Sequence, residues 1–325
     1  MKWINSCVPA LALLGVISCG SSGSLNGEAS NQPAEDKDKT QSEQQESSHF
    51  TAIKAFSLEA DGPEQGASAY QLIEQVFGRG SIESPDMYSN DHTDVVHIIE
   101  DHDEIVGNHF VFLAHRDLDL NKGVASDRQR NEIKAYDKSN SDLLAFEGET
   151  FQYRWKFKVS SELELSSKFT HFFQLKAKNA SESFANGNDN QPIITLSGAE
   201  ASSSGNELQV RYSKGHANAS QLLQSYYMAR LNWDVIVDEW VEVFVQATYA
   251  EQGELIFEIT RLRDNNKVLA IHEQDIDLLR ANDAGDFVRP KWGIYRSIAE
   301  TASLRADEEQ VRFANFSIIK GVIDK

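Results

Sequence analysis

Short runs in which polar and apolar residues alternate recur along the chain after residue 80, with turn-rich loops between them. Alternation with a period of two places every second side chain on the same face, as in a β-strand that buries one side. Many such strands with few helices predict an all-β sandwich. The predicted strands are residues 127–134, 151–159, 170–177, 207–212, 240–248, 255–261, 291–296 and 311–318.

One short helix is predicted ahead of the strands, in residues 67–77. Its apolar residues recur at helical spacing, and glycines follow directly, which is typical of a helix end. These apolar residues are Ala67, Tyr70, Ile73 and Phe77. No second linker is visible after Phe50, and the six prolines of the chain do not cluster. We therefore expect residues 50–325 to form a single β-jelly-roll sandwich with this helix near its N-terminus.

The first 49 residues predict export rather than a folded core. The apolar stretch Val8–Ile17 follows a basic start. At about ten residues, it is too short to span a bilayer but typical of a signal peptide. The residues before Cys19 resemble a bacterial lipobox, which implies a lipoprotein signal peptide in residues 1–18 and a lipid on Cys19. Residues 19–49 are rich in Ser, Gln and Glu, and we expect a disordered tether. The alternative is an ordinary signal peptide with an incidental cysteine.

Under either interpretation the protein is exported. A lipid on Cys19 would anchor it to a bacterial outer membrane, in the periplasm or at the cell surface, with no other membrane contact. The chain has 50 acidic and 31 basic side chains and a formal net charge of −19. Proteins that bind nucleic acid through its phosphates are usually basic, so we expect no nucleic-acid partner. Cys7 and Cys19 are the only cysteines, so the rest of the chain has no disulfide and no thiolate metal site.

Three predicted strands each carry a row of polar side chains on one face. The first row is Arg128, Arg130, Glu132 and Lys134, the second is Gln174 and Lys176 beside Phe172, and the third is Lys291, Gly293, Tyr295 and Ser297. Strand parity turns His171 away from the second row and turns Trp292 and Ile294 away from the third. A glycine in such a row lets a ligand or another backbone approach closely.

These three segments resemble the signature strands of the jelly-roll polysaccharide lyases, a clan that includes alginate lyases, heparin lyase I and glucuronan lyases. In the alginate lyases the strands read approximately R-[ST]-E-L, Q-I-H and Y-F-K-A-G-V-Y-N-Q. This chain has, in the same order, Arg130-Asn131-Glu132-Ile133, Gln174-Leu175-Lys176 and Lys291-Trp292-Gly293-Ile294-Tyr295-Arg296. The resemblance covers residues 125–320 and implies a concanavalin A-like jelly roll. It also implies cleavage of a uronic-acid polysaccharide by β-elimination.

The resemblance implies a role for each residue of these strands. Such a reaction needs donors that neutralise the uronate carboxylate, and a base and an acid that move the proton. The implied catalytic residues are Tyr295, Gln174, Arg130 and Lys291, with Tyr295 as acid, base or both. The implied substrate-binding residues are Arg128, Asn131, Glu132, Lys134, Lys176, His171 and Arg296. Glu132 is expected to orient Arg130 or Lys291, and strand parity turns Arg296 away from the others.

The histidines depart from the family pattern. Lys176 stands where the pattern has a histidine, and His171 has the opposite parity, so it faces the other side unless a β-bulge intervenes. Five further histidines lie between residues 92 and 115, and another strand or loop would have to bring one of them to the site. Their spacings match no zinc signature, and we predict no metal site. They are His92, His97, His102, His109 and His115.

Two other functions fit the same strands. The first is a non-catalytic glycan-binding surface lipoprotein. The second is a glycoside hydrolase, which needs two carboxylates at a set separation. The closest pattern for a hydrolase is Glu100–Glu104, but His102 occupies the place of the central acid. Glu239 and Glu242 would face opposite sides of a strand.

Other candidate sites are weaker. Asp117, Asp119 and Asn121, followed by Gly123, resemble a calcium loop, as does the stretch 186–190, but plain turns account for both. We expect no cofactor. Among the tryptophans, Trp240 and Trp292 suit a core, whereas Trp233 is predicted to be an exposed platform for sugars.

The charge balance sharpens the expectation for the partner. The segment 50–325 is strongly acidic overall, which disfavours a broad basic surface. A local basic groove can still attract and orient an anionic polysaccharide. We therefore predict a monomer with one basic groove on an otherwise acidic sandwich.

Overall fold

The computed structural model describes residues 49–178, 191–201, 205–214, 225–280 and 286–324. The predicted signal peptide, Cys19, almost all of the tether and the candidate calcium loop at 186–190 lie outside these ranges. None of the helices within them has the length and apolar character needed to cross a membrane.

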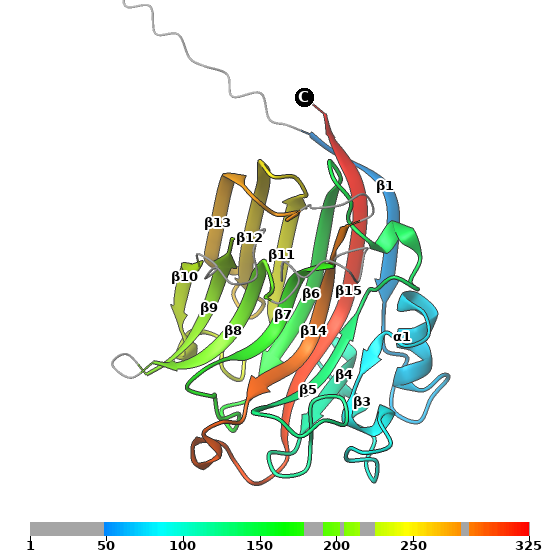
Figure 1. The fold of residues 1–325 in the computed structure, drawn as a ribbon, viewed down its shortest axis with the longest axis vertical. Coiled ribbons are helices and arrows are strands. Elements are labelled where there is room, and N and C mark those ends of the chain that lie inside the picture. The colour runs from blue at the N-terminus through cyan, green and yellow to red at the C-terminus, as the bar shows by residue number, and fades with distance from the viewer. Residues whose placement is uncertain (1–48, 179–190, 202–204, 215–224, 281–285, 325) are drawn as a thin grey trace, which may run out of the picture. The chain divides into compact units, whose positions relative to one another are not determined.

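Two antiparallel sheets make up the sandwich (Figure 1). The first sheet runs in the order β13 (Asn266–Ile276), β12 (Gly253–Arg261), β11 (Val241–Thr248), β6 (Thr150–Val159), β15 (Glu309–Asp324), β4 (Gly107–Ala114) and β3 (Ile98–Asp103), and β1 (His49–Leu58) also pairs with β15. The second sheet runs in the order β10 (Ser225–Asn232), β9 (Gly205–Ser213), β8 (Ile194–Ala201), β7 (Thr170–Lys178), β14 (Phe287–Ser297), β5 (Arg128–Lys134) and β2 (Ile82–Glu83). The predicted all-β jelly-roll sandwich is confirmed.

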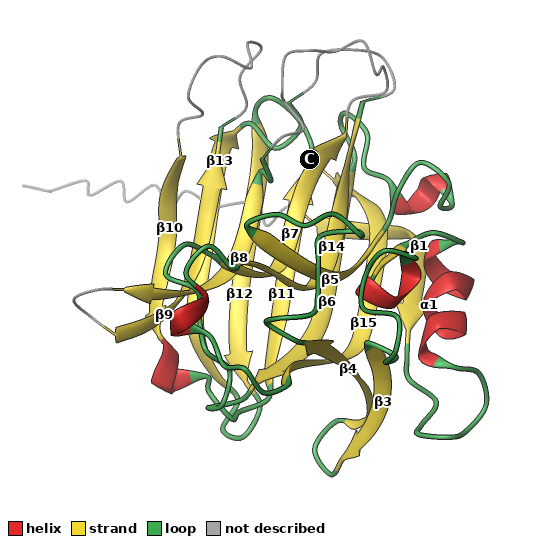
Figure 2. Cartoon of the chain, turned by 60° about the horizontal axis from the view of Figure 1, so that its bottom comes forward, coloured by secondary structure: helices red, strands yellow, loops and turns green. Residues whose placement is uncertain are grey.

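Strands dominate the described residues, and helices are short (Figure 2). The predicted helix is present as α1 (Ala69–Phe77), beside β1 and β3. It begins two residues later than predicted because Ser68 caps it, in a capping box with Gln71. The remaining helical pieces are the 3₁₀ turns η1 (Pro85–Met87), η2 (Ser141–Leu143), η3 (Trp233–Val235) and η4 (Thr301–Ser303).

Aromatic side chains fill the space between the sheets. Trp292 of β14 lies within 6.3 Å, centroid to centroid, of Trp155 and Tyr153 of β6 and Phe173 of β7. All four are essentially excluded from solvent, as predicted for Trp292. Such rings each bury a large apolar area, so they hold the two layers together. The prediction for Trp233 is wrong, because it is 5 % exposed and its ring packs against Phe172 in the core.

A β-bulge in β7 changes which side chains share its outer face. Phe172 and Phe173 are adjacent in sequence, yet both are buried in the core. The register with β8 shifts between His171 and Phe173, and the register with β14 shifts at the same level. His171 therefore pairs with Tyr295, and Gln174 pairs with Lys291. The bulge puts His171 and Gln174 on the same outer face, which corrects the parity assigned to His171.

Gly293 allows β14 to lie close to β5. Its φ is +139°, and a Cβ there would be 2.2 Å from the carbonyl oxygen of Asn131. A close approach at Gly293 was predicted for a ligand or another backbone. In the structure it is the backbone of β5 that approaches. Because the strands meet here, Tyr295 lies directly opposite Arg130.

Candidate active site

A basic pocket of about 240 Å³ opens on the outer face of the second sheet. Among the described residues that line it there are five lysines and arginines and no carboxylate. The lining residues are Arg128, Arg130, Lys168, Phe169, His171, Gln174, Lys176, Gln191, Pro192, Thr195, Arg211, Ser213 and Tyr295. We call this the basic pocket. It brings together six residues from all three predicted polar strands.

Tyr295 lies in the basic pocket between two arginines. Arg128 donates a hydrogen bond from Nη1 to the Tyr295 hydroxyl oxygen at 3.1 Å. The Arg130 guanidinium lies over the Tyr295 ring, 3.8 Å from its centroid. Both contacts place positive charge next to the Tyr295 side chain.

His171 reaches the pocket because of the bulge. Its ring lies 5.9 Å from that of Tyr295 and 4.6 Å from that of Phe169, and its Nδ1 is 2.7 Å from Ser197 Oγ. Burial, together with the positive charge of Arg130, lowers the pKa of His171 to about 3. The imidazole is therefore neutral at ordinary pH.

Beneath the pocket, two buried carboxylates hold the basic side chains. Glu83 of β2 accepts hydrogen bonds from Lys291 at 2.7 Å, Arg130 at 3.2 Å and Lys134 at 2.5 Å. Glu132 of β5 accepts from Lys291 at 2.6 Å and from Arg130 at 2.5 Å. Glu132 also accepts from Gln174 Nε2. We call Glu83 and Glu132 the carboxylate pair.

The charges of this network set its protonation states. Burial alone would raise the pKa of Glu83, but Lys291, Arg130 and Lys134 hold it well below its usual value. The pKa of Glu132 is lowered in the same way by Lys291 and Arg130. Both groups are thus ionised at neutral pH. Burial, with help from Arg130, lowers the pKa of Lys291 to about 8.

Several predicted substrate contacts lie elsewhere. Asn131 is 1 % exposed and donates hydrogen bonds to the carbonyl oxygens of His97 and Leu113 on the inner face. Arg296 is also fully buried, with its Nη1 2.5 Å from Glu309 Oε2. Strand parity turns both residues inward, so the prediction that they bind substrate is corrected.

Three other predicted residues belong to the support of the pocket. Lys291, Glu132 and Lys134 are on the predicted face, but none of them lines the basic pocket. Lys291 pairs with Glu132 and Glu83, and Lys134 pairs with Glu83. These three side chains lie below the pocket surface. They can hold Arg130 and Gln174 in position but do not lie where a polymer would bind. Lys291 therefore moves from a predicted catalytic residue to a positioning residue.

Sequence reasoning missed Glu83, Arg211 and Lys168. Glu83 lies in a two-residue strand without periodicity, Arg211 in β9 and Lys168 in a loop, outside the three polar rows. The alternation in residues 207–212 did predict a strand. This alternation could have assigned Arg211 to one face of its strand. It could not have shown that Arg211 lies in the same pocket as residues of β7, because β8 separates the two strands.

The other candidate sites do not form comparable centres. A larger cavity of about 980 Å³ is lined by Glu147, Glu251, Glu273, Asp275 and Asp277, so it disfavours anions. Glu239 and Glu242 pair with Arg263 and Arg154, respectively. Of the candidate calcium loop, Asp117 pairs with Arg116, whereas Asn121 accepts from Arg130.

The fold and sequence together define the protein as a jelly-roll lyase. The model of the polysaccharide lyase family matches residues 64–319, and the chain belongs to this family. It is thus an enzyme, a lyase acting on polysaccharides. No curated protein sequence matches the chain.

Two solved structures are similar to this chain. The PL-14 alginate lyase from Aplysia kurodai has a TM-score of 0.52 at 11 % identity, and the match covers 82 % of this chain and 98 % of that one. The endo-β-1,4-glucuronan lyase from the fungus Trichoderma reesei has a TM-score of 0.48 at 15 % identity, covering 74 % of this chain and 94 % of that one. At 11 % identity, the likeness to the Aplysia kurodai enzyme is one of fold.

We predict that the carboxylate pair makes the fold acid-labile. Glu83 has a lower pKa in the folded than in the unfolded state, so its stabilisation is present above pH 4.5 and is lost as pH falls below it. Glu83→Gln should lower the free energy of unfolding at neutral pH by about 3–5 kcal/mol, because it leaves buried cations unpaired. It should also reduce the loss of stability on acidification, measured by urea denaturation at several pH values.

Glu242→Gln is the matched control for Glu83→Gln. Glu242 forms a half-exposed pair with Arg154, and such pairs contribute less than about 1 kcal/mol. Equal effects of the two substitutions would show that the carboxylate pair does not have this role.

Proposed function

We propose that this enzyme is exported and cleaves a uronic-acid polysaccharide by β-elimination. The observation that carries the proposal is the basic pocket, which contains Tyr295 and His171 and no carboxylate among its described lining residues. The chain has 19 more acidic than basic residues. Five cationic side chains nevertheless line the pocket that contains Tyr295. Local positive potential of this kind attracts and orients a polyanion even on an acidic protein.

The first requirement of the reaction is neutralisation of the uronate carboxylate. This lowers the cost of negative charge on the adjacent carbon in the transition state. Arg130 uses Nε for Asn121 and Nη1 for the carboxylate pair. Its Nη2 makes no hydrogen bond to the described residues, and we propose that it binds the substrate carboxylate. Lys176 and Arg211 line the same pocket and add positive charge.

The second requirement is proton transfer. A base removes the proton from the carbon next to the carboxylate, a carbon–carbon double bond forms, and the bond from the neighbouring carbon to the glycosidic oxygen breaks. The leaving oxygen then takes a proton from an acid. Tyr295, with Arg128 at its hydroxyl, fits as the group that exchanges protons, and the neutral His171 is close enough to share this role.

Hydrolysis has less support at this site. A glycosidase of the usual kind needs two carboxylates facing the scissile bond. Glu83 and Glu132, the carboxylates that hold Arg130 beneath the pocket, are each 2 % exposed at the side chain and are paired with cations. They are positioned to orient basic groups rather than to reach a sugar.

A panel of polymers tests the proposed substrate class. We expect one of alginate, glucuronan, ulvan or heparin-type polymers to yield an unsaturated product, followed by its ultraviolet absorbance. Neutral polymers of similar length serve as the control, because they offer no carboxylate to the basic pocket. Cleavage of neutral polymers alone, or new reducing ends without unsaturation, would contradict β-elimination of a uronate.

On the active polymer, Tyr295→Phe should lower turnover by at least about 10²-fold, because it removes the transferable proton. His171→Asn should lower turnover as well, with a smaller effect if Tyr295 acts alone as acid and base. Tyr226→Phe is the control, since Tyr226 is exposed and lines the larger acidic cavity. Thermal melts establish that each variant is folded. Full activity of folded Tyr295→Phe would exclude the role given to Tyr295.

Export and lipid anchoring rest on the N-terminal sequence alone. If Cys19 carries the lipid, Cys19→Ala should shift the protein from the membrane fraction to the soluble fraction of a bacterial host. Cys7→Ala is the control, because Cys7 precedes the apolar stretch that would be removed. Fractionation followed by immunoblotting measures the shift, and an unchanged membrane fraction for Cys19→Ala would contradict the anchor.

A further inference from the structure

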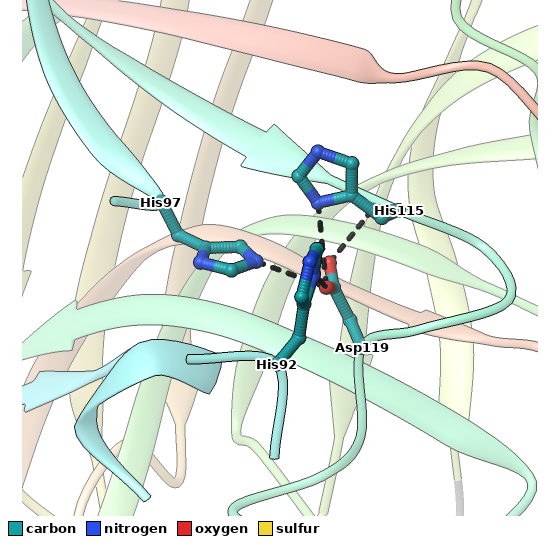
Figure 3. A group of neighbouring side chains, drawn as sticks. All are labelled: His92, His97, His115 and Asp119. Carbon is teal, nitrogen blue, oxygen red and sulfur yellow. Dashed lines mark hydrogen bonds and ion pairs between the residues drawn. The ribbon is translucent and has the colours of Figure 1, made fainter. Parts of the chain in front are cut away.

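A cluster of three histidines and one aspartate lies outside the basic pocket (Figure 3). His92 and His97 come from the segment between η1 and β3, and His115 and Asp119 come from the segment between β4 and β5. One ligand atom from each of the four residues lies within 4.8 Å of the others. We call this the histidine cluster.

All three imidazoles point at a single oxygen. His92 Nδ1 and His97 Nε2 are each 2.9 Å from Asp119 Oδ1, and His115 Nδ1 is 3.3 Å from it. The three rings are nearly perpendicular to one another, at 83–88°. Nitrogens that surround one oxygen in this way share a common centre, as the ligands of a metal ion do.

One buried nitrogen of the histidine cluster lacks a hydrogen-bond partner among the described residues. His115 Nδ1 is buried and, among the described residues, has no hydrogen-bond partner in spite of its proximity to Asp119. An unsatisfied buried polar atom costs about 1–3 kcal/mol, so such atoms are rare without a reason. A cation held between the three nitrogens and the Asp119 oxygen would satisfy it.

The ring nitrogens of His97 and His115 that face away from Asp119 contact a carbonyl or carboxylate oxygen, as is common for metal-bound histidines. His97 Nδ1 is 2.9 Å from the carbonyl oxygen of Val95 and 3.3 Å from Asp86 Oδ1. His115 Nε2 is 3.0 Å from Glu308 Oε2. A carbonyl or carboxylate on the far nitrogen fixes the tautomer and strengthens the near nitrogen as a ligand. The other oxygen of Asp119 accepts from the His115 backbone N–H at 2.7 Å, which leaves Oδ1 for a metal.

We propose that the histidine cluster binds a zinc ion, with His92, His97, His115 and Asp119 as its four ligands. Three imidazoles and one carboxylate are donors that zinc accepts, and four protein ligands make a closed, structural site. Zinc bonds of about 2.0–2.2 Å place tetrahedral ligands about 3.3–3.6 Å apart. The nitrogen–oxygen distances of 2.9, 2.9 and 3.3 Å lie at or just below this range. His92 and His115 are slightly exposed at the side chain, 11 % and 14 %, which gives the ion a way in.

The zinc ion would fix the loop that supports Arg130. Asp91, next to His92, accepts hydrogen bonds from the backbone N–H groups of Leu120 and Gly123. Between these two, Asn121 accepts from Arg130 Nε, and Lys122 pairs with Glu83. The site would thus tie two segments together under the basic pocket. The metal would not touch the substrate.

Metal analysis of the full-length protein tests the site without any enzymatic assay. We expect about one zinc per chain after dialysis, loss of this zinc with a strong chelator, and a thermal midpoint that rises by about 5 °C or more when zinc is restored. Cobalt substituted for zinc should give the intense visible bands of a four-coordinate ion. Hydrogen exchange at the Leu120 and Gly123 amides should be faster in the metal-free protein.

Variants at the exposed edge of the cluster assign the ligands. His92→Ala and His115→Ala should each lose at least about tenfold in zinc affinity and lose the cobalt bands while remaining folded. His102→Ala is the control, because His102 is an exposed histidine bonded to Asn108. Substoichiometric zinc with no thermal shift would overturn the proposal. So would zinc binding that is unchanged in His92→Ala and His115→Ala.

Discussion

The basic pocket depends on the burial of two carboxylates beneath it. Glu83 and Glu132 form ion pairs with Lys291, Arg130 and Lys134. They lie on β2 and β5, at one edge of the second sheet. Burying these charges is costly unless each is paired, so the strands are restrained to positions that keep the pairs intact. The same ion pairs position Arg130. Its Nη1 binds both carboxylates, and its guanidinium lies over the Tyr295 ring. The geometry of the pocket is therefore a consequence of two buried carboxylates that do not line it.

The bulge in β7 supplies what that network lacks. The carboxylate pair orients cations and Gln174, but it offers no neutral proton acceptor in the pocket. With regular alternation, His171 would lie in the core. One extra inward residue, Phe172, brings the imidazole beside Tyr295. Phe172 compensates by packing on Phe157 and Trp233 in the core.

Local alternation accounts for how far the sequence alone could predict this site. It placed Arg128 and Arg130 on one face correctly, and it identified most strands and the helix, because period and parity are properties of neighbouring residues. It failed at His171, where the parity changes within a strand. It also could not find Glu83 or the histidine cluster, since these join segments that are distant along the chain. The spacing of the histidines matched no zinc signature, yet the fold of β3 and β4 brings three of them to one oxygen.

The acidic composition has a different meaning once the pocket is located. Net charge acts over distances at which salt screens it strongly, whereas the pocket cations lie within a few ångströms of any bound group. A polymer arriving at the pocket therefore meets Arg128, Lys176 and Arg211 at close range, and the remote acidic side chains oppose it only weakly. An acidic exterior also discourages non-productive contact of a polyanion with the rest of the surface. Positive charge concentrated at the basic pocket would therefore favour binding of the proposed anionic polymer beside Tyr295.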